Sequence, residues 1–417
     1  MNAALWADAI SGLDKNGAIF LAGACGEPTA FLEALREDPQ IGADREFTGI
    51  WIPGVNSFDP TAICENANVT TIFATPDLQA GTASGRVRVL PAHYSSAYKW
   101  FRSGHGISGA VFQVAPPEKG LISLGVCADF IPALVEAGIP LIGQINPQMP
   151  VTRNGPAVPQ DRFSALIEAP HDLIEYSAGA PSHTLADIAV KAAELVRPGD
   201  TVQFGIGKLQ PAIVDALSET PDLAVHGGMV SDRLHEALCE GMFQRGVLTG
   251  VALGSRAFYQ DIARHERVRF ASVAVTHDAA VLRSLESFVA INSVLEVDLY
   301  GQCNGEFIGD SQITGHGGLA DFIRGANASD GGRSIVALPS TAAKGRRSRI
   351  VARLNPNNPV TIARSDAHWV VTEHGAVNLQ HADMDQRAEL LISIASPEFR
   401  DSLADDWVAI RRGREPA

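Results

Sequence analysis

The stretch FGIGKLQPAIVDALSET, residues 204–220, leaves an apolar strand-like run, turns at two glycines and continues in an amphipathic pattern typical of a helix. An earlier stretch, AGACGEPTAFLEALRED, residues 22–38, aligns with it without gaps. Each has the pattern of a strand, a glycine turn and a helix, which is one βα unit. The match predicts that two halves of the chain begin in the same way, although shared α/β patterning alone would also produce it.

Apolar runs of strand length alternate with helical patterns along both halves, from AIFLAG to PLIGQINP and again from TVQFGIG to VLEVDLYG. This alternation predicts α/β architecture with largely buried, parallel strands. A proline-rich stretch without strand patterns, QMPVTRNGPAVPQDRFSALIEAPHDLIEYSAGAPSH, separates the two series. We therefore predict two similar open α/β domains with largely parallel sheets, residues 1–180 and residues 181–417.

The composition excludes several classes of protein. With 46% hydrophobic and 19% charged residues, the 417-residue chain is typical of a soluble globular protein. Its formal charge of −14 argues against a nucleic acid or an anionic membrane as the main partner. Five dispersed cysteines predict reduced thiols, and no signal peptide or long apolar segment is recognisable. The expected location is the cytoplasm.

One strand-like segment, INSVLEVDLYGQCNGE at residues 291–306, carries two acids among apolar residues. Side chains two apart on a strand share a face, so Glu296 and Asp298 point the same way. An edge strand with one face in water is the simpler interpretation, and a carboxylate held at a reactive site is the alternative. The alignment of the halves places Glu296 opposite Val114, so the acid belongs to the second half alone, as an active site added to a repeated fold would.

Two glycine-rich loops are candidate ligand-binding segments. FGIGKLQ contains Gly205 and Gly207 but has Gln210 in place of the third glycine of GxGxxG, which argues against a nucleotide-dependent oxidoreductase. GHGG, residues 315–318, precedes a helical pattern, where glycines let backbone amides approach an anionic ligand, although a plain tight turn has the same composition. We find no metal-ligand spacing and no GxSxG nucleophile motif.

Eight segments occur in an order that resembles the acetyl-CoA hydrolase/transferase family, which includes 4-hydroxybutyrate and succinyl-CoA:acetate CoA-transferases. They are GACGEP, PAHYS, APPEKGLISLG, QFGIGKLQPAI, EVDLYGQCNGE, GHGGLADFIRGA, VVTEHGAVNL and RAELLISIASPEFRDSL. The resemblance implies ping-pong transfer of CoA between an acyl-CoA and a small carboxylic acid through a glutamyl-CoA thioester. It also implies a homo-oligomer that binds CoA as a substrate, with no metal and no permanently bound cofactor.

The resemblance also implies roles for individual residues. Glu296 is expected to be the nucleophile, Asp298 to support the following turn, and Gly375 of the TE-x-G segment to contact CoA or the thioester. From the internal repeat and the tendency of ligands to bind between domains, we expect the first half to complete the acid pocket with residues 23–27 and 113–119. Lys119 is there a candidate partner for a second substrate carboxylate, and a plain exposed turn lysine is the alternative interpretation. The residues expected to bind CoA are Ser272, Val273, Ala274, Val275, Thr276, Gly205, Gly207, Gly315, Gly317 and Gly318.

The sequence departs from the family pattern at three places. Gly23 stands where hydroxybutyrate-type relatives often carry histidine, the stretch APPEKG is shortened, and a family glutamate before the SD pair is replaced within GGMVSD, residues 227–232. These departures predict intact core chemistry with an altered acid-binding pocket. Hydrolysis, with water as the acceptor, and CoA binding without catalysis are the alternative functions.

Overall fold

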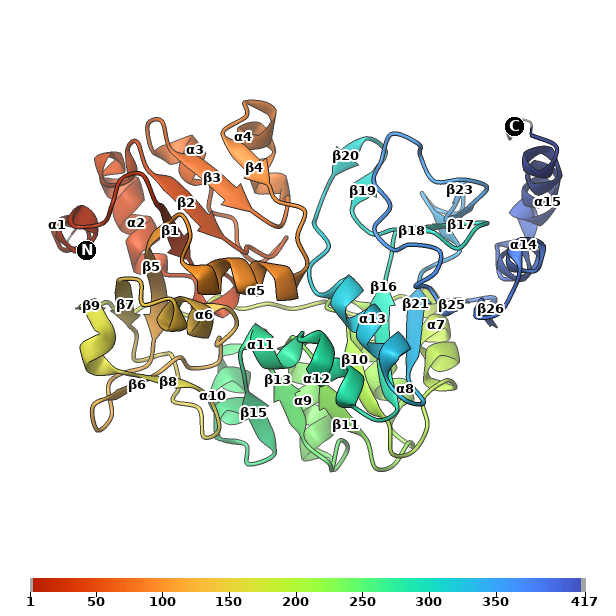
Figure 1. Cartoon of the computed structure of the whole chain (residues 1–417). Coiled ribbons are helices and arrows are strands. Elements are labelled where there is room, and N and C mark those ends of the chain that lie inside the picture. Colours follow the sequence, from red (N-terminus) through yellow and green to blue (C-terminus); the bar gives the residue numbers. More distant parts are fainter. Residues whose placement is uncertain (1–2, 414–417) are drawn as a thin grey trace.

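The computed structural model describes residues 3–413, in which two sheets lie side by side with helices packed around each (Figure 1). Residues 1–2 and 414–417, at the outer ends of the two predicted domains, lie outside the described residues. Within residues 3–413, no helix is long and apolar enough to span a membrane.

The first sheet has seven strands, and all neighbouring pairs are parallel. Its longest strand, β5, is buried at every position, because helices cover both faces of a parallel sheet. The spatial order is β4 (Val87–Val89), β3 (Asn68–Thr71), β2 (Glu46–Gly49), β1 (Ala18–Leu21), β5 (Ile107–Val114), β7 (Leu141–Ile145) and β9 (Phe163–Glu168).

The second sheet repeats this strand order and adds an eighth strand that pairs antiparallel at one edge. The prediction of two similar α/β halves with largely parallel sheets is therefore confirmed. The boundary at residue 180 stays a prediction, and it falls within residues 169–182, which contain no helix or strand. The order is β15 (Val268–Phe270), β13 (Val247–Thr249), β11 (Ala224–His226), β10 (Thr201–Phe204), β16 (Phe288–Ser293), β21 (Arg333–Ala337), β25 (Trp369–Thr372) and β26 (Gly375–Asn378).

Helices connect the strands and cover the sheets. As the aligned stretches predict, α2 follows β1 and α8 follows β10, each after a glycine-containing turn. The longer helices are α1 (Ala3–Ser11), α2 (Thr29–Glu37), α5 (Tyr94–Ser103), α6 (Ile131–Glu136), α7 (His183–Ala193), α8 (Leu209–Ala216), α9 (Asp232–Cys239), α10 (Arg256–Arg264), α12 (Ala279–Ser284), α13 (Leu319–Ala328), α14 (Met384–Ser393) and α15 (Pro397–Arg411).

The segment with the paired acids forms β17 (Glu296–Asp298), which lies outside both large sheets. It is the middle strand of a three-stranded sheet, between β18 (Cys303–Asn304) and β24 (Ile350–Val351), so the edge-strand interpretation is wrong. Asp298 is buried and accepts hydrogen bonds from the backbone N–H groups of Tyr300 and Gln302 at 3.1 and 2.8 Å. It therefore supports the turn, as expected.

Backbone hydrogen bonds join the two halves along a seam, which we define as residues 126–129 of the first half against residues 250–252 of the second. The Ala128 N–H donates to the Gly250 carbonyl at 3.0 Å, and the Ala252 N–H donates to the Val126 carbonyl at 2.9 Å. Such strand-like pairing satisfies buried backbone groups from both halves at once. The seam therefore fixes how the two sheets are oriented.

A second contact between the halves caps a helix. Asp321, on α13 of the second half, accepts hydrogen bonds from the backbone N–H and the hydroxyl of Ser95 at 3.1 and 2.6 Å. Ser95 lies in the first turn of α5, whose own N-cap residue His93 makes no side-chain cap bond. A helix N-terminus leaves backbone N–H groups unpaired, and here a carboxylate from the other half satisfies one of them.

We expect Asp321→Ala to lower the free energy of unfolding by about 1–2 kcal/mol, because it removes this cap and leaves the α5 N-terminus unpaired. Asp405→Ala is the matched control, since Asp405 is exposed on α15. The urea unfolding midpoint measures both variants. Equal midpoints for the two variants would contradict the stabilising role of Asp321.

Candidate active site

A cavity of about 230 Å³, here called the interdomain pocket, lies between the two halves. Its walls are the segments that follow β1, β2 and β3 in the first half and β10, β11, β13 and β16 in the second. The carboxyl ends of parallel strands are the usual position of ligand sites in open α/β sheets, and two such edges meet here. The repeated fold thus produces one shared pocket.

Both predicted glycine loops reach this pocket. Gly205, Gly315, Gly317 and Gly318 line it, whereas Gly207 is not among the lining residues. A Cβ at Gly318 would lie only 2.3 Å from Nε2 of His277. Residue 318 must therefore be glycine for the loop to pack against His277, which is a stronger requirement than that of a plain tight turn.

His277 is a pocket residue that the sequence analysis did not select. Its Nδ1 lies 2.7 Å from the hydroxyl oxygen of Thr276, and its ring packs between Tyr94 and Phe322. Burial lowers the pKa of His277 to about 3, so the imidazole is neutral at physiological pH. The only sequence signal was its position directly after the segment expected to bind CoA.

The segment Ser272–Thr276 forms Ser272 and the short helix α11 (Val273–Thr276), and its residues face different surroundings. Val273 and Thr276 are buried, and Ala274 packs against the core of the first half. Ser272 and Val275 instead line a separate cleft of about 610 Å³. The expected CoA-binding segment thus lies between this cleft and the interdomain pocket.

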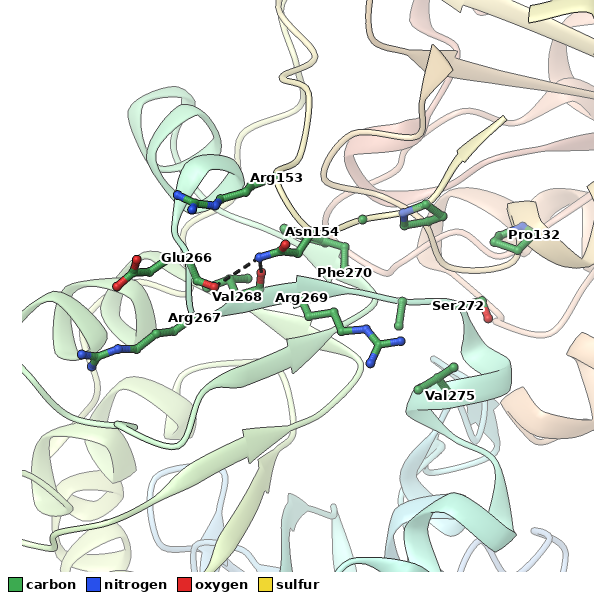
Figure 2. A pocket seen from close by; sticks show the side chains of 13 residues that line it. Pro132, Arg153, Asn154, Glu266, Arg267, Val268, Arg269, Phe270, Ser272 and Val275 are labelled. Carbon is green, nitrogen blue, oxygen red and sulfur yellow. Dashed lines mark hydrogen bonds between the residues drawn. The ribbon is translucent and has the colours of Figure 1, made fainter. Parts of the chain in front are cut away.

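That separate cleft is rich in arginine, and we call it the arginine cleft. Arg153 from the first half and Arg267 and Arg269 from the second line it, together with Glu266 (Figure 2). All four of these side chains are exposed. Figure 2 shows Arg153 and Arg267 at one end and Ser272 at the other, with Arg269 between them.

Glu296, the predicted nucleophile, lines neither the interdomain pocket nor the arginine cleft. It faces another cleft, which β24 and α15 border, and its carboxylate accepts a hydrogen bond from the Asn304 amide at 2.9 Å. Arg349 is its charged neighbour: burial lowers the pKa of Arg349, while Glu296 and Glu373 oppose that shift. The catalytic role of Glu296 stays a prediction.

Gly375 also lies apart from the interdomain pocket. It is the first residue of β26, and a Cβ there would lie 2.9 Å from the Ile394 side chain. The preceding Glu373 accepts hydrogen bonds from the N–H and hydroxyl of Ser340 at 2.8 and 2.6 Å, which anchors the hairpin. Gly375 thus follows two residues after Glu373, which interacts with Arg349 as Glu296 does, and it does not lie with the glycine loops of the interdomain pocket.

The two first-half segments expected to complete the acid pocket, residues 23–27 and 113–119, contribute little to the interdomain pocket. Ala24 lines the interdomain pocket, whereas Lys119 is exposed in a turn after β5 and is not among the lining residues. Lys119 therefore gives no support to a preference for dicarboxylates. At Gly23 a Cβ would lie 2.0 Å from the Ile50 carbonyl oxygen, so this backbone has no room for a larger side chain.

Comparison with known proteins supports the sequence-based resemblance. Residues 254–407 match the acetyl-CoA hydrolase/transferase C-terminal domain. A 4-hydroxybutyrate coenzyme A transferase of Clostridium kluyveri is 30% identical over 409 residues, covering 96% of this chain and 95% of the relative. The chain belongs to the acetyl-CoA hydrolase/transferase family.

Other members of the acetyl-CoA hydrolase/transferase family extend the comparison. A succinyl-CoA:cyclohexane-1-carboxylate CoA transferase of Geobacter metallireducens is 28% identical, covering 91% of this chain and 89% of the relative. The acetyl-CoA hydrolase of Saccharomyces cerevisiae is 26% identical, and the match covers 49% of this chain and 39% of the hydrolase. The transferases match more of the chain than this hydrolase, which favours CoA transfer as the activity.

Solved structures agree with the fold. RipA from Yersinia pestis superposes with a TM-score of 0.89 at 28% identity, covering 99% of this chain and all of that one. A 4-hydroxybutyrate CoA-transferase from Porphyromonas gingivalis has a TM-score of 0.78 at 28% identity, covering 98% and 97%. The two-sheet arrangement of this chain is thus shared with both solved structures.

We expect Gly318→Ala to reduce turnover at least about tenfold, because the new methyl group would displace His277 and narrow the pocket. Gly12→Ala is the control, since no atom lies within 4 Å of a Cβ built there. Steady-state kinetics with an acyl-CoA and a carboxylate measure the effect. Normal turnover of Gly318→Ala would show that the glycine is not needed for the reaction.

Proposed function

We propose that the protein is a CoA-transferase that moves CoA between an acyl-CoA and a small carboxylic acid in the interdomain pocket. The observation that carries this proposal is the near-complete match to CoA-transferases, combined with a pocket that both halves line with glycine loops. Hydrolysis on the same scaffold is the second candidate, and the weaker similarity to hydrolases makes it less favoured.

The reaction requires a carboxylate nucleophile and donors for a developing oxyanion. A side-chain carboxylate attacks the thioester, an acid anhydride forms, and the CoA thiolate then attacks the enzyme's carbonyl to give an enzyme-bound thioester. Backbone N–H groups of the 315–318 loop and of the α13 N-terminus are the candidate oxyanion donors, since both border the pocket.

The arginine cleft is our candidate site for the phosphates of CoA. Three guanidinium groups and one carboxylate line it, so it carries a net positive charge. Guanidinium groups bind phosphate oxygens through paired hydrogen bonds. Ser272 and Val275 form one end of the arginine cleft, and His277, two residues further along the chain, lines the interdomain pocket. A long substrate that follows residues 272–277 would therefore extend from the arginine cleft toward the interdomain pocket.

The acceptor acid is expected to have a short apolar chain and one carboxylate. Side chains such as Ile52, Phe73 and Phe204 line the pocket, whereas no lysine or arginine does within the described part of the chain. His316 is the lining residue best able to carry positive charge, because a hydrogen bond with Glu306 raises its pKa.

A cytoplasmic location and a homo-oligomeric state complete the proposal. All five cysteines are free and four are buried, which is compatible with a reducing compartment. The oligomeric state rests on the family resemblance alone, and sedimentation of the purified protein would measure it.

Incubation with butyryl-CoA and a panel of acids tests the activity, and mass spectrometry of the products identifies the acyl-CoA species. We expect new acyl-CoA species with acetate and with other short monocarboxylates, and slower transfer to succinate. Release of free CoA without any new acyl-CoA would instead establish a hydrolase.

We expect Arg267→Ala combined with Arg269→Ala to raise the KM for acyl-CoA at least about tenfold with little change in kcat, because phosphate contacts are equal in the ground and transition states. The difference from wild type should shrink at high salt. Arg283→Ala, which removes an exposed arginine on α12, is the control. A similar KM in all variants would place the phosphates of CoA elsewhere.

A further inference from the structure

The interdomain pocket contains one carboxylate that the sequence analysis did not select. Asp129 is the only aspartate or glutamate among the pocket-lining residues of the described chain. Within residues 3–413, neither of its carboxylate oxygens accepts a hydrogen bond, and the side chain is half-buried. Carboxylates that are partly withdrawn from water are usually paired, so one that is unpaired and lines a cavity is a candidate reactive group.

The backbone holds Asp129 firmly in this position. It is the last residue of the seam segment, and its carbonyl accepts a hydrogen bond from the Val273 N–H at 3.1 Å. The preceding Ala128 is bonded to Gly250 of the second half. Asp129 has φ of 35°, a region that residues other than glycine rarely occupy, and such strained positions persist where the surrounding structure enforces them.

Asp129 lies close to the glycines of the stretch GGMVSD, residues 227–232. Gly228 accepts hydrogen bonds from the N–H groups of Gly250 and Val251, both at 3.0 Å. A Cβ on Gly250 would lie 3.2 Å from the Gly228 carbonyl oxygen and 3.9 Å from Oδ1 of Asp129. Gly250 therefore separates Asp129 from Gly228, and Gly228 contributes no side chain to this part of the pocket.

The surroundings of Asp129 suit a nucleophile. Burial raises the pKa of Asp129 to about 7, so the ionised carboxylate is more basic than an ordinary one. Tyr94 and Cys127 face it with pKa values raised by burial and by neighbouring groups, and His277 in the same pocket stays neutral. Asp129 is thus the carboxylate of the pocket that ionises near neutral pH, and the pKa of another lining residue, His316, is raised by its hydrogen bond with Glu306.

We propose that Asp129 attacks the acyl-CoA thioester, so that the enzyme-bound CoA thioester forms on an aspartate of the first half. This inference rests on the proposed CoA-transferase function. Glu296, the nucleophile expected from the resemblance, is the rival assignment, and its separate cleft is the structural reason for preferring Asp129.

The steps balance without a further reactant. A carboxylate oxygen of Asp129 bonds to the thioester carbon, the carbon–sulfur bond breaks, and CoA leaves as thiolate from a mixed anhydride. The thiolate attacks the Asp129 carbonyl carbon, which releases the first acid as a carboxylate and leaves aspartyl-CoA. The acceptor carboxylate then repeats these two steps in reverse, which forms the new acyl-CoA and frees Asp129.

Borohydride trapping of the wild-type enzyme locates the thioester directly. Butyryl-CoA is added without acceptor, borohydride reduces any enzyme thioester to an alcohol, and peptide mass spectrometry identifies the modified residue. We expect the modification at Asp129, in a yield that depends on prior addition of butyryl-CoA. Modification at Glu296, or at no residue in an enzyme that transfers CoA, would overturn the inference.

Kinetics provide the second test. Asp129→Asn should lose at least about a thousandfold in kcat while its affinity for CoA, measured by calorimetry, stays within about twofold. Asp405→Asn, which changes an exposed carboxylate on α15, is the control with normal turnover. A comparable loss in Glu296→Gln, with Asp129→Asn still active, would establish the rival assignment.

The pH profile must agree with this assignment. Because the ionised form is the nucleophile and burial raises its pKa to about 7, kcat should fall about tenfold per pH unit below that value and level off above it. A plateau extending down to about pH 5 would contradict it. A wild-type enzyme that transfers no CoA would overturn the proposed function together with this inference, whereas transfer without Asp129 would overturn the inference alone.

Discussion

The backbone pairing along the seam is the interaction on which the other features of the site depend. Each sheet alone would present the carboxyl ends of its strands to solvent, and neither half alone contains the interdomain pocket. Hydrogen bonds between residues 126–129 and residues 250–252 bring the two edges together without large side chains. Backbone hydrogen bonds therefore hold the pocket walls in place, so the shape of the pocket depends little on side chains elsewhere in the chain.

The repeated fold explains both the symmetry and the asymmetry of the molecule. The two sheets share one strand order, and their first helices follow equivalent turns. The second half then adds β26 to its large sheet and builds a separate small sheet around β17. The two halves consequently contribute different polar groups to the interdomain pocket, Asp129 from the first half and His277 from the second.

Much of the fold was predictable because it depends on local patterns. The alternation of strand and helix patterns and the aligned glycine turns are properties of short segments, and both predict two parallel α/β halves. The glycines at 205, 315, 317 and 318 were found for the same reason, since loops before helices have a recognisable composition.

The rest of the site was not predictable from local pattern. Asp129 stands in the unremarkable stretch VCADF, and it becomes a pocket residue only when the seam pairs it with a segment more than a hundred residues away. Conversely, the local pattern around Glu296 correctly indicates a strand, but which cleft that strand faces is set by its pairing with β18 and β24. The packing of distant segments decides which acids share a pocket.

The hydrogen bonds between Asn154 of the first half and the edge strand β15 have a consequence for how the chain acquires its fold. Asn154 of the first half accepts a hydrogen bond from the Phe270 N–H at 2.8 Å, and its amide donates to two carbonyls near β15. A fragment beginning at residue 181 would expose that strand edge, which is a template for intermolecular pairing. During synthesis the first half emerges earlier, so it is available to cover the edge as soon as β15 leaves the ribosome.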